Sequence, residues 1–76
     1  MIPELESVVL VGDLPEYGLR DGDIGTVVHS HPGDAGYEVE FVTLDGETFA
    51  VVSAFPHQVR PLGRREIAQA RALEVA

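Results

Sequence analysis

The chain of 76 residues has room for one small domain and excludes a second hydrophobic core. Apolar residues make up 45% of it and charged residues 24%, which is typical of a folded soluble domain and excludes a largely disordered one. The formal net charge of −8 argues against nucleic-acid binding, because such proteins neutralise phosphates with lysine and arginine.

The first two predicted strands are separated by a long loop. The run Val8–Val11 is rich in β-branched residues and predicts the first strand. Residues 14–23 combine turn formers with three spaced apolar anchors, which predicts a loop folded back onto the core; the anchors are Leu14, Tyr17 and Leu19. The second predicted strand is Ile24–His29, where Gly25 indicates a bend or a close backbone approach.

The clearest predicted strand is Tyr37–Phe41, in which apolar and acidic residues alternate. Because successive side chains of a strand point to opposite faces, one face is expected to be buried and the other solvated. The predicted inward residues are Tyr37, Val39 and Phe41, and the predicted outward residues are Glu38 and Glu40.

Two further strands complete the predicted sheet. Asp45-Gly46 indicates a tight hairpin turn with positive φ at both residues, leading into a strand over residues 48–53. After a single turn at residues 56–58, residues 59–62 predict a short closing strand, which Pro61 limits to an edge or an end.

The C-terminal residues 63–76 differ in composition from the rest of the chain. Residues 1–62 contain 11 acidic residues and two arginines, whereas residues 63–76 are rich in alanine and contain three arginines. A thin apolar stripe predicts a helix over residues 64–75, formed by Ile67, Ala70 and Leu73. A helix of this length is marginal in water, so we expect it to pack on the barrel or on a partner.

These elements predict a mainly β fold, a small five-stranded SH3-like barrel over residues 1–62, with the C-terminal helix or tail over residues 63–76. Four segments also resemble the bacterial family catalogued as domain of unknown function 4926, namely residues 13–19, 22–28, 37–41 and 58–61. The resemblance covers roughly residues 7–62. It implies a small SH3-like barrel, often encoded beside toxin-like genes, and it assigns no catalytic or binding residues.

Nothing in the sequence indicates catalysis, so we expect a protein that is not an enzyme and needs no cofactor. The serines at positions 7, 30 and 53 lie in no nucleophile motif. Glu38 and Glu40 share a face, but they are better explained as a solvated acidic surface than as an acid–base pair. The chelating pair His29 and His31, with Asp34 nearby, offers too few convergent ligands for a conventional metal site.

The absence of cysteine excludes disulfides and thiolate metal sites. The first residues lack the charged start and apolar stretch of a signal peptide. The longest apolar runs, such as Val8–Val11, are far shorter than the roughly 20 residues of a membrane helix. We therefore expect a cytoplasmic protein without a membrane partner.

The best candidate for partner binding is an aromatic anchor inside an acidic rim. Tyr17 is the anchor, and the alternative is that it packs on the barrel as a lid. The full predicted partner-binding set is Glu16, Tyr17, Asp21, Asp23, Glu38 and Glu40. Partial exposure is also expected at three apolar residues that could contact a partner or a second copy of the chain, Val42, Val52 and Phe55.

The leading functional hypothesis is a non-catalytic module that binds a basic protein partner. The family resemblance implies that this module could be an antitoxin-like inhibitor of a neighbouring gene product. One alternative is an accessory barrel domain or subunit of a larger enzyme. A weaker alternative is RNA binding through the loop before Ile24, which the acidic Asp21 and Asp23 disfavour. The sequence also leaves a homodimer open.

Overall fold

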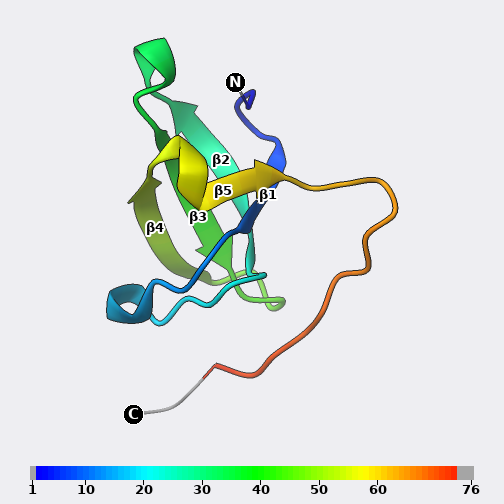
Figure 1. The fold of residues 1–76 in the computed structure, drawn as a ribbon. Helices are drawn as coiled ribbons and strands as arrows, with labels where there is room; N and C mark the ends of the chain where they lie inside the picture. The colour runs from blue at the N-terminus through cyan, green and yellow to red at the C-terminus, as the bar shows by residue number, and fades with distance from the viewer. Residues whose placement is uncertain (1, 74–76) are drawn as a thin grey trace.

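In the computed structural model, which describes residues 2–73, the chain forms one antiparallel sheet with the strand order β4-β3-β2-β1-β5 (Figure 1). The strands are β1 (Ser7–Leu10), β2 (Ile24–Ser30), β3 (Tyr37–Val42), β4 (Thr48–Ala54) and β5 (Val59–Pro61). Three short 3-10 helices interrupt the connections, η1 (Pro15–Tyr17), η2 (Pro32–Asp34) and η3 (Pro56–Gln58). The five strands predicted from the sequence are therefore confirmed.

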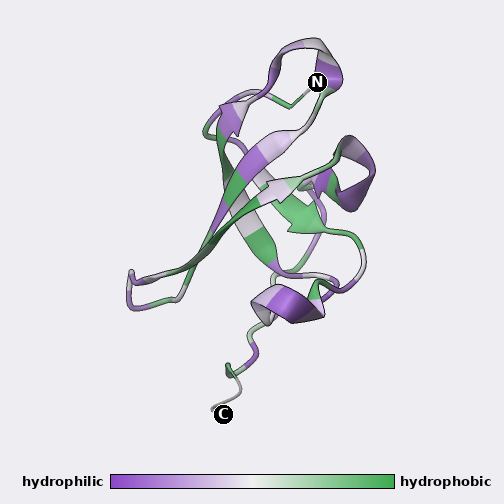
Figure 2. Ribbon diagram, turned by 90° about the vertical axis from the view of Figure 1, so that its left-hand side faces the viewer, coloured by the Kyte–Doolittle hydropathy of each residue, from purple (hydrophilic) through white to green (hydrophobic). Residues whose placement is uncertain are grey.

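The hydrophobic core lies on the inner face of this curved sheet. The predicted inward side chains of β3 are all buried, and Val39 at the centre is completely inaccessible to solvent. Figure 2 shows that hydrophobic residues concentrate in the strands and hydrophilic residues in the turns. The core cluster comprises Ile2, Val8, Leu10, Leu19, Val27, Tyr37, Val39, Phe41, Val52, Ala54 and Val59.

The close backbone approach predicted at Gly25 is confirmed. A Cβ atom on this residue would lie 2.7 Å from Val39 Cγ1 and 2.9 Å from Phe41 Cε1. Gly25 pairs with Val8 of β1, and the inward side chains of Val39 and Phe41 from the neighbouring strand β3 lie close to its backbone. The absence of a side chain lets these strands pack directly on each other.

The sheet does not close into a barrel. Within the described residues, β4 and β5 lie at the two edges and do not pair with each other. The predicted SH3-like barrel is therefore right in its five antiparallel strands and wrong in its closure. β5 has only three residues and ends at Pro61, which has no N–H to donate, so the last strand offers little backbone for a closing ladder.

The β3–β4 hairpin differs from the predicted two-residue turn. Gly46 N–H donates to Thr43 O, and Thr43 N–H donates to Glu47 O, both at 2.9 Å. Gly46 has φ of 88°, whereas Asp45 is not among the residues with positive φ. The connection is thus a three-residue loop that ends in a left-handed glycine, which is the next most common way to join two antiparallel strands.

The predicted C-terminal helix is not formed. Residues 64–73 contain one turn at 64–65 and no α-helix, and residues 74–76 lie outside the described part of the chain (Figure 1). An extended chain advances about 3.3 Å per residue, against about 1.5 Å in a helix. The extended tail can therefore make two separate contacts, one with β5 and one with the first loop, whereas a short isolated helix would gain little stability in water.

Among the described residues, none of the helices is long and apolar enough to cross a membrane.

Candidate functional site

The first loop, between β1 and β2, uses its own carboxylates to hold its shape. Gly12 N–H donates to Asp21 Oδ1 at 2.8 Å, and Asp21 N–H donates to Asp13 Oδ1 at 2.9 Å. Arg20 N–H donates to Asp23 Oδ2 at 2.8 Å. Aspartate side chains commonly satisfy loop amides in this way. Asp21 and Asp23, predicted to form an acidic rim for a partner, thus make structural hydrogen bonds within the loop.

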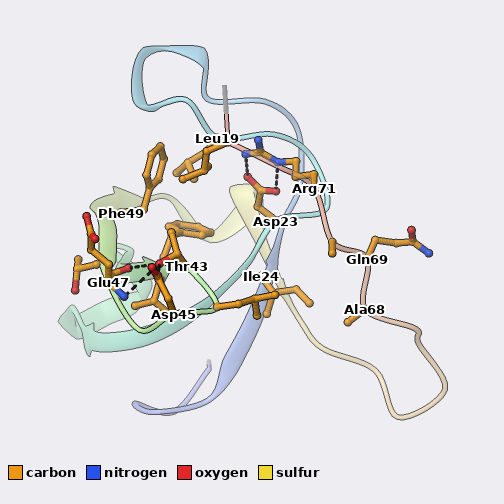
Figure 3. A pocket seen from close by; sticks show the side chains of 16 residues that line it. Leu19, Asp23, Ile24, Thr43, Asp45, Glu47, Phe49, Ala68, Gln69 and Arg71 are labelled. Atoms are coloured by element: carbon orange, nitrogen blue, oxygen red, sulfur yellow. Dashed lines mark hydrogen bonds and ion pairs between the residues drawn. The ribbon is translucent and has the colours of Figure 1, made fainter. Parts of the chain in front are cut away.

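Asp23 also carries an ion pair to the C-terminal tail (Figure 3). Arg71 donates from Nε to Asp23 Oδ1 at 2.8 Å and from Nη2 to Asp23 Oδ2 at 2.6 Å, and Nη2 also donates to Gly18 O at 3.1 Å. Burial alone would raise the pKa of Asp23, but the hydrogen bonds from Arg71 and the Arg20 N–H outweigh it and lower the pKa. Its charge is therefore already balanced within the chain.

Tyr17, predicted both as an apolar residue of this loop that packs on the core and as an aromatic contact for a partner, lies at the surface of the loop. Tyr17 is 46% exposed in η1, next to the exposed Glu16, whereas Leu19 is buried in the core. Leu14 and Leu19 form a bridge that closes the loop behind η1. Glu16 and Tyr17 are thus presented to solvent, apart from the hydrogen-bonded carboxylates of the same loop.

A second anchor holds the tail just after β5. Arg60 donates from Nη1 to Glu66 Oε1 at 2.8 Å and from Nη2 to Glu66 Oε2 at 2.7 Å, and Gly63 N–H donates to the same carboxylate. These hydrogen bonds, with that from Arg60 the largest cause, lower the pKa of Glu66 to about 2. The tail therefore leaves β5 through a charged turn at Glu66 and contacts the first loop at Arg71.

This second anchor is expected to release in acid. Because the pKa of Glu66 is about 2 in the folded chain, its contribution is fully present above the ordinary carboxylate pKa and is lost as pH falls through about 2. The NMR shift of the Gly63 amide should titrate with that midpoint. Glu66→Gln should abolish the titration, and a midpoint near the ordinary value of about 4.3 would contradict the anchor.

The outward carboxylates of β3 form a different kind of surface. Glu40 Oε2 accepts a hydrogen bond from Thr48 Oγ1 at 2.6 Å, and Glu38 accepts from Ser53 Oγ at 2.8 and 2.7 Å. Both hydroxyls come from β4, so the carboxylates lean over the neighbouring strand. We call this surface the acidic face and define it as Glu38, Glu40, Thr48, Val51 and Ser53.

Two arginine ion pairs lie away from the acidic face, since Arg60 pairs with Glu66 and Arg71 pairs with Asp23. His31 Nε2 lies 2.7 Å from Glu38 Oε2. Hydrogen bonds from His31, chiefly, and Ser53 lower the pKa of Glu38. Glu38 is therefore ionised at neutral pH, and hydrogen bonds from β4 hold the side chains of both Glu38 and Glu40 in a fixed orientation.

The contacts of Ser53 do not resemble those of a catalytic nucleophile. Its hydroxyl donates to Glu38, and His31 contacts that same carboxylate rather than the hydroxyl. A serine nucleophile needs its proton directed at the base, so this arrangement orients Glu38 and does not activate Ser53. The prediction that the chain is not an enzyme stays a prediction.

The two histidines on this side of the sheet contact different carboxylates. His29 Nδ1 lies 3.4 Å from Glu4 Oε2, whereas His31 contacts Glu38. The two rings meet edge to face, with centroids 4.9 Å apart. Within the described residues, no group of three or more histidine or acidic side chains could hold a metal ion.

An open groove of about 770 Å³ lies between the β3–β4 hairpin and the tail (Figure 3). Its apolar lining includes Ile24, Phe41, Val42, Phe49 and Leu73. Its polar residues largely contact one another, since Asp23 pairs with Arg71 and Thr43 donates to Asp45. The groove therefore has apolar area but no set of free polar groups directed at a ligand.

Two of the three apolar residues predicted to be partly exposed are so. Val42 is 52% and Phe55 is 61% exposed, whereas Val52 is only 1% exposed and belongs to the core. The prediction for Val52 was wrong because β4 alternates from Ala50, so Val52 points inward opposite Val39.

Comparison with known families gives one result. Residues 4–61 match the family model described as Domain of unknown function (DUF4926). The chain belongs to the DUF4926 family. Neither a curated protein nor a solved structure matches it.

The DUF4926 match contains the whole acidic face and the first loop but ends before Gly63. The acidic face thus lies in the family region, whereas Glu66 and Arg71 of the tail lie beyond it. Sequence analysis missed Arg71, Thr48 and Ser53 as partners of the acidic residues. Strand alternation could have placed Ser53 beside Glu38, but no local pattern links Arg71 to Asp23, which are 48 positions apart.

Proposed function

We propose that this chain is a non-catalytic protein-interaction module, acting in the cytoplasm, that binds a basic protein partner through the acidic face. The observation that carries the proposal is the pair of β3 carboxylates held by β4 hydroxyls. In this proposal the SH3-like arrangement of short strands serves as a rigid support for that pair. Charged groups fixed before binding lose less conformational entropy when a partner arrives.

The charge of the surroundings supports the same proposal. The chain carries a net charge of −8, which would attract a cationic partner over a distance of roughly 8–10 Å at physiological salt. The carboxylates of the first loop contribute less, because Asp23 is paired with Arg71. We therefore place the main contact on β3 and β4, with Glu16 and Tyr17 as a secondary contact.

The product of a neighbouring gene is the first natural partner to test. The family resemblance implies toxin-like neighbours, and inhibition of such a protein would make this chain an antitoxin-like inhibitor. Such binding does not require a large apolar area at the centre of the interface, since charge complementarity mainly sets the rate and specificity of association.

The proposal is tested with a synthetic peptide of alternating arginine and valine. The double variant Glu38→Gln with Glu40→Gln should bind this peptide at least about tenfold more weakly, because two charge-assisted contacts are lost. Isothermal titration calorimetry at low salt measures the dissociation constant. Raising the salt concentration should weaken binding of the unaltered chain.

The matched control is Glu6→Gln with Asp34→Asn, which makes the same change in net charge outside the acidic face. Both residues are exposed, and asparagine tolerates the positive φ of 57° at position 34. The control should retain binding within about threefold, which is the loss expected from weaker long-range attraction alone. An equal loss in both variants, or no binding at low salt, would refute the proposal.

A further inference from the structure

The mode of binding can be inferred from the edge of the sheet beside the acidic face. We propose that the basic partner binds as an extended strand that pairs with the free edge of β4 and places its cationic side chains over Glu38 and Glu40. This inference rests on the proposed function and specifies how the partner docks. It predicts a sixth strand in the complex.

The outer edge of β4 is open in the structure. β4 is the last strand in the sheet order, and its register pairs it with β3 alone. Within residues 2–73, no backbone hydrogen bond joins Thr48–Ala54 to a segment other than β3. In an antiparallel pair, alternate residues direct their N–H and C=O groups away from the partner strand, so β4 presents unpaired groups along its length.

The two edges of the sheet differ in how they are protected. β5 has three residues and contains Arg60 and Pro61, and both charge and proline oppose the addition of another strand. β4 has seven residues and contains no charged residue and no proline. An unprotected edge of this length is unusual in natural sheets and is typical of sites where an extended peptide is added.

The acidic face determines the chemistry of the added strand. Neighbouring strands lie about 4.8 Å apart, so outward side chains of an added strand would lie beside Val51 and Ser53 and about two strand spacings from β3. Glu38 and Glu40 reduce this gap because they already lean over β4 to accept hydrogen bonds from Ser53 and Thr48. A long cationic side chain can span the remaining distance, with its stem lying over Val51.

An exposed aromatic side chain lies at the C-terminal end of β4. Phe55 is 61% exposed directly after the strand, whereas Phe49, near its start, is 39% exposed and has its ring beside Gly18 in the groove. Phe55 stacks on His57, with ring centroids 5.9 Å apart. Aromatic residues are enriched in interfaces, so Phe55 supplies apolar contact area for the side chains of the partner.

A second copy of the chain is a poorer occupant of this edge. Pairing of two β4 strands would bring two molecules of net charge −8 together with no cation in either strand. It would also place the Glu38 and Glu40 carboxylates of both copies along one continuous sheet. The charge repulsion favours a basic strand instead.

Hydrogen exchange of the full chain tests the inference with the same arginine–valine peptide. On saturation with peptide, one alternate set of β4 amides should exchange at least about tenfold more slowly, whereas β5 amides should not change. A second peptide carries N-methyl groups on two consecutive central residues and keeps its charge. Alternate residues of a strand direct their N–H groups to the same side, so one of these two residues would donate to β4 whichever way the peptide runs. N-methylation removes that donor. The methylated peptide should bind at least about fivefold more weakly.

Each outcome has a distinct meaning. A peptide that binds with unchanged β4 exchange, and equally well when N-methylated, would overturn strand addition and leave the proposed function intact. A peptide that does not bind at all would refute the proposed function itself. β4 amides already protected in the free chain, together with a doubled molecular mass, would assign the edge to a second copy and overturn the inference.

A matched pair of variants gives a second measurement. Val51→Lys places a charge at the exposed edge, where lysine is a common natural block to strand addition, and it should weaken peptide binding at least about tenfold. Val28→Lys makes the same charge change at a 40% exposed valine in the interior strand β2 and should cost no more than about threefold. Equal losses would contradict pairing at β4.

Discussion

Substitution of Gly25 by alanine is expected to lower the free energy of unfolding by about 1–2 kcal/mol. Alanine restricts the unfolded chain, which would stabilise the protein by about 0.4–1 kcal/mol if the folded site had room. It does not, because the new Cβ would lie 2.7 Å from Val39 Cγ1 and 3.0 Å from Glu40 O. Overpacking of a core typically costs about 1–3 kcal/mol, so the unfavourable effect prevails. Urea denaturation measures the change.

A double variant isolates the cause of this loss. Val39→Ala removes the Cγ1 atom that the new methyl group would meet, so Gly25→Ala should cost less in the Val39→Ala background than in the unaltered chain. Phe41 Cε1 would still lie 2.9 Å from the Cβ, so the relief should be partial. Strictly additive costs would show that contact with Val39 does not limit position 25.

Binding should respond to Gly25→Ala only through the fraction of folded protein. A Cβ on Gly25 would point to the inward face with Val39 and Phe41, on the side opposite the outward carboxylates. The inward face of β3, which packs in the core, is therefore separate from its outward face, which contacts solvent. A binding loss larger than the unfolded fraction would indicate that the acidic face shifts with the core.

Local patterns in the sequence were sufficient to predict the strands of this chain. The alternation from Tyr37 to Phe41 reports burial directly, because one residue of slip would place glutamate in the core. Gly25 could be identified as a close approach because a glycine inside a strand pattern usually marks a bend or a tight backbone contact. These features depend on neighbours in the chain, which a single sequence contains.

Features that depend on distant residues were predicted less well. The tail pattern satisfied a helix template over residues 64–75, but Glu66 and Arg71 instead bind partners in β5 and the first loop. Closure of the sheet likewise depends on whether β4 meets β5, which no local pattern specifies. The β3–β4 loop has three residues rather than the predicted two, because Asp-Gly is compatible with several short turns.

In the candidate site too, features set by neighbours in the chain were predicted and contacts between distant residues were not. Sequence analysis could place Glu38 and Glu40 on an outward face, because strand periodicity is local. It grouped Asp21 and Asp23 with them by charge alone and could not detect that loop amides and Arg71 engage these carboxylates. Net charge counts carboxylates, whereas the contacts of each carboxylate depend on which distant residues the fold brings beside it.

Substitution of Arg71 by alanine is expected to detach the C-terminal tail from the first loop. The guanidinium makes two hydrogen bonds to Asp23 and one to Gly18 O, and the Asp23 side chain is only 17% exposed. Loss of charge-assisted hydrogen bonds from a half-buried carboxylate should cost about 1–2 kcal/mol. Trypsin cleavage after Arg64 and Arg65 should become faster, since a detached tail fits a protease more readily.

A double-mutant cycle separates the ion pair from other effects of the tail. Asp23→Asn alone should also loosen the tail, and Arg71→Ala should then add little further loss of stability. Arg64→Ala serves as the control for removal of one exposed arginine and should leave the stability unchanged within about 0.5 kcal/mol. If Arg71→Ala behaved like Arg64→Ala, the tail would not be held at Asp23.

If the double-mutant cycle shows coupling between Asp23 and Arg71, detachment of the tail should leave peptide binding at the acidic face unchanged, because Arg71 contacts the loop and not β3 or β4.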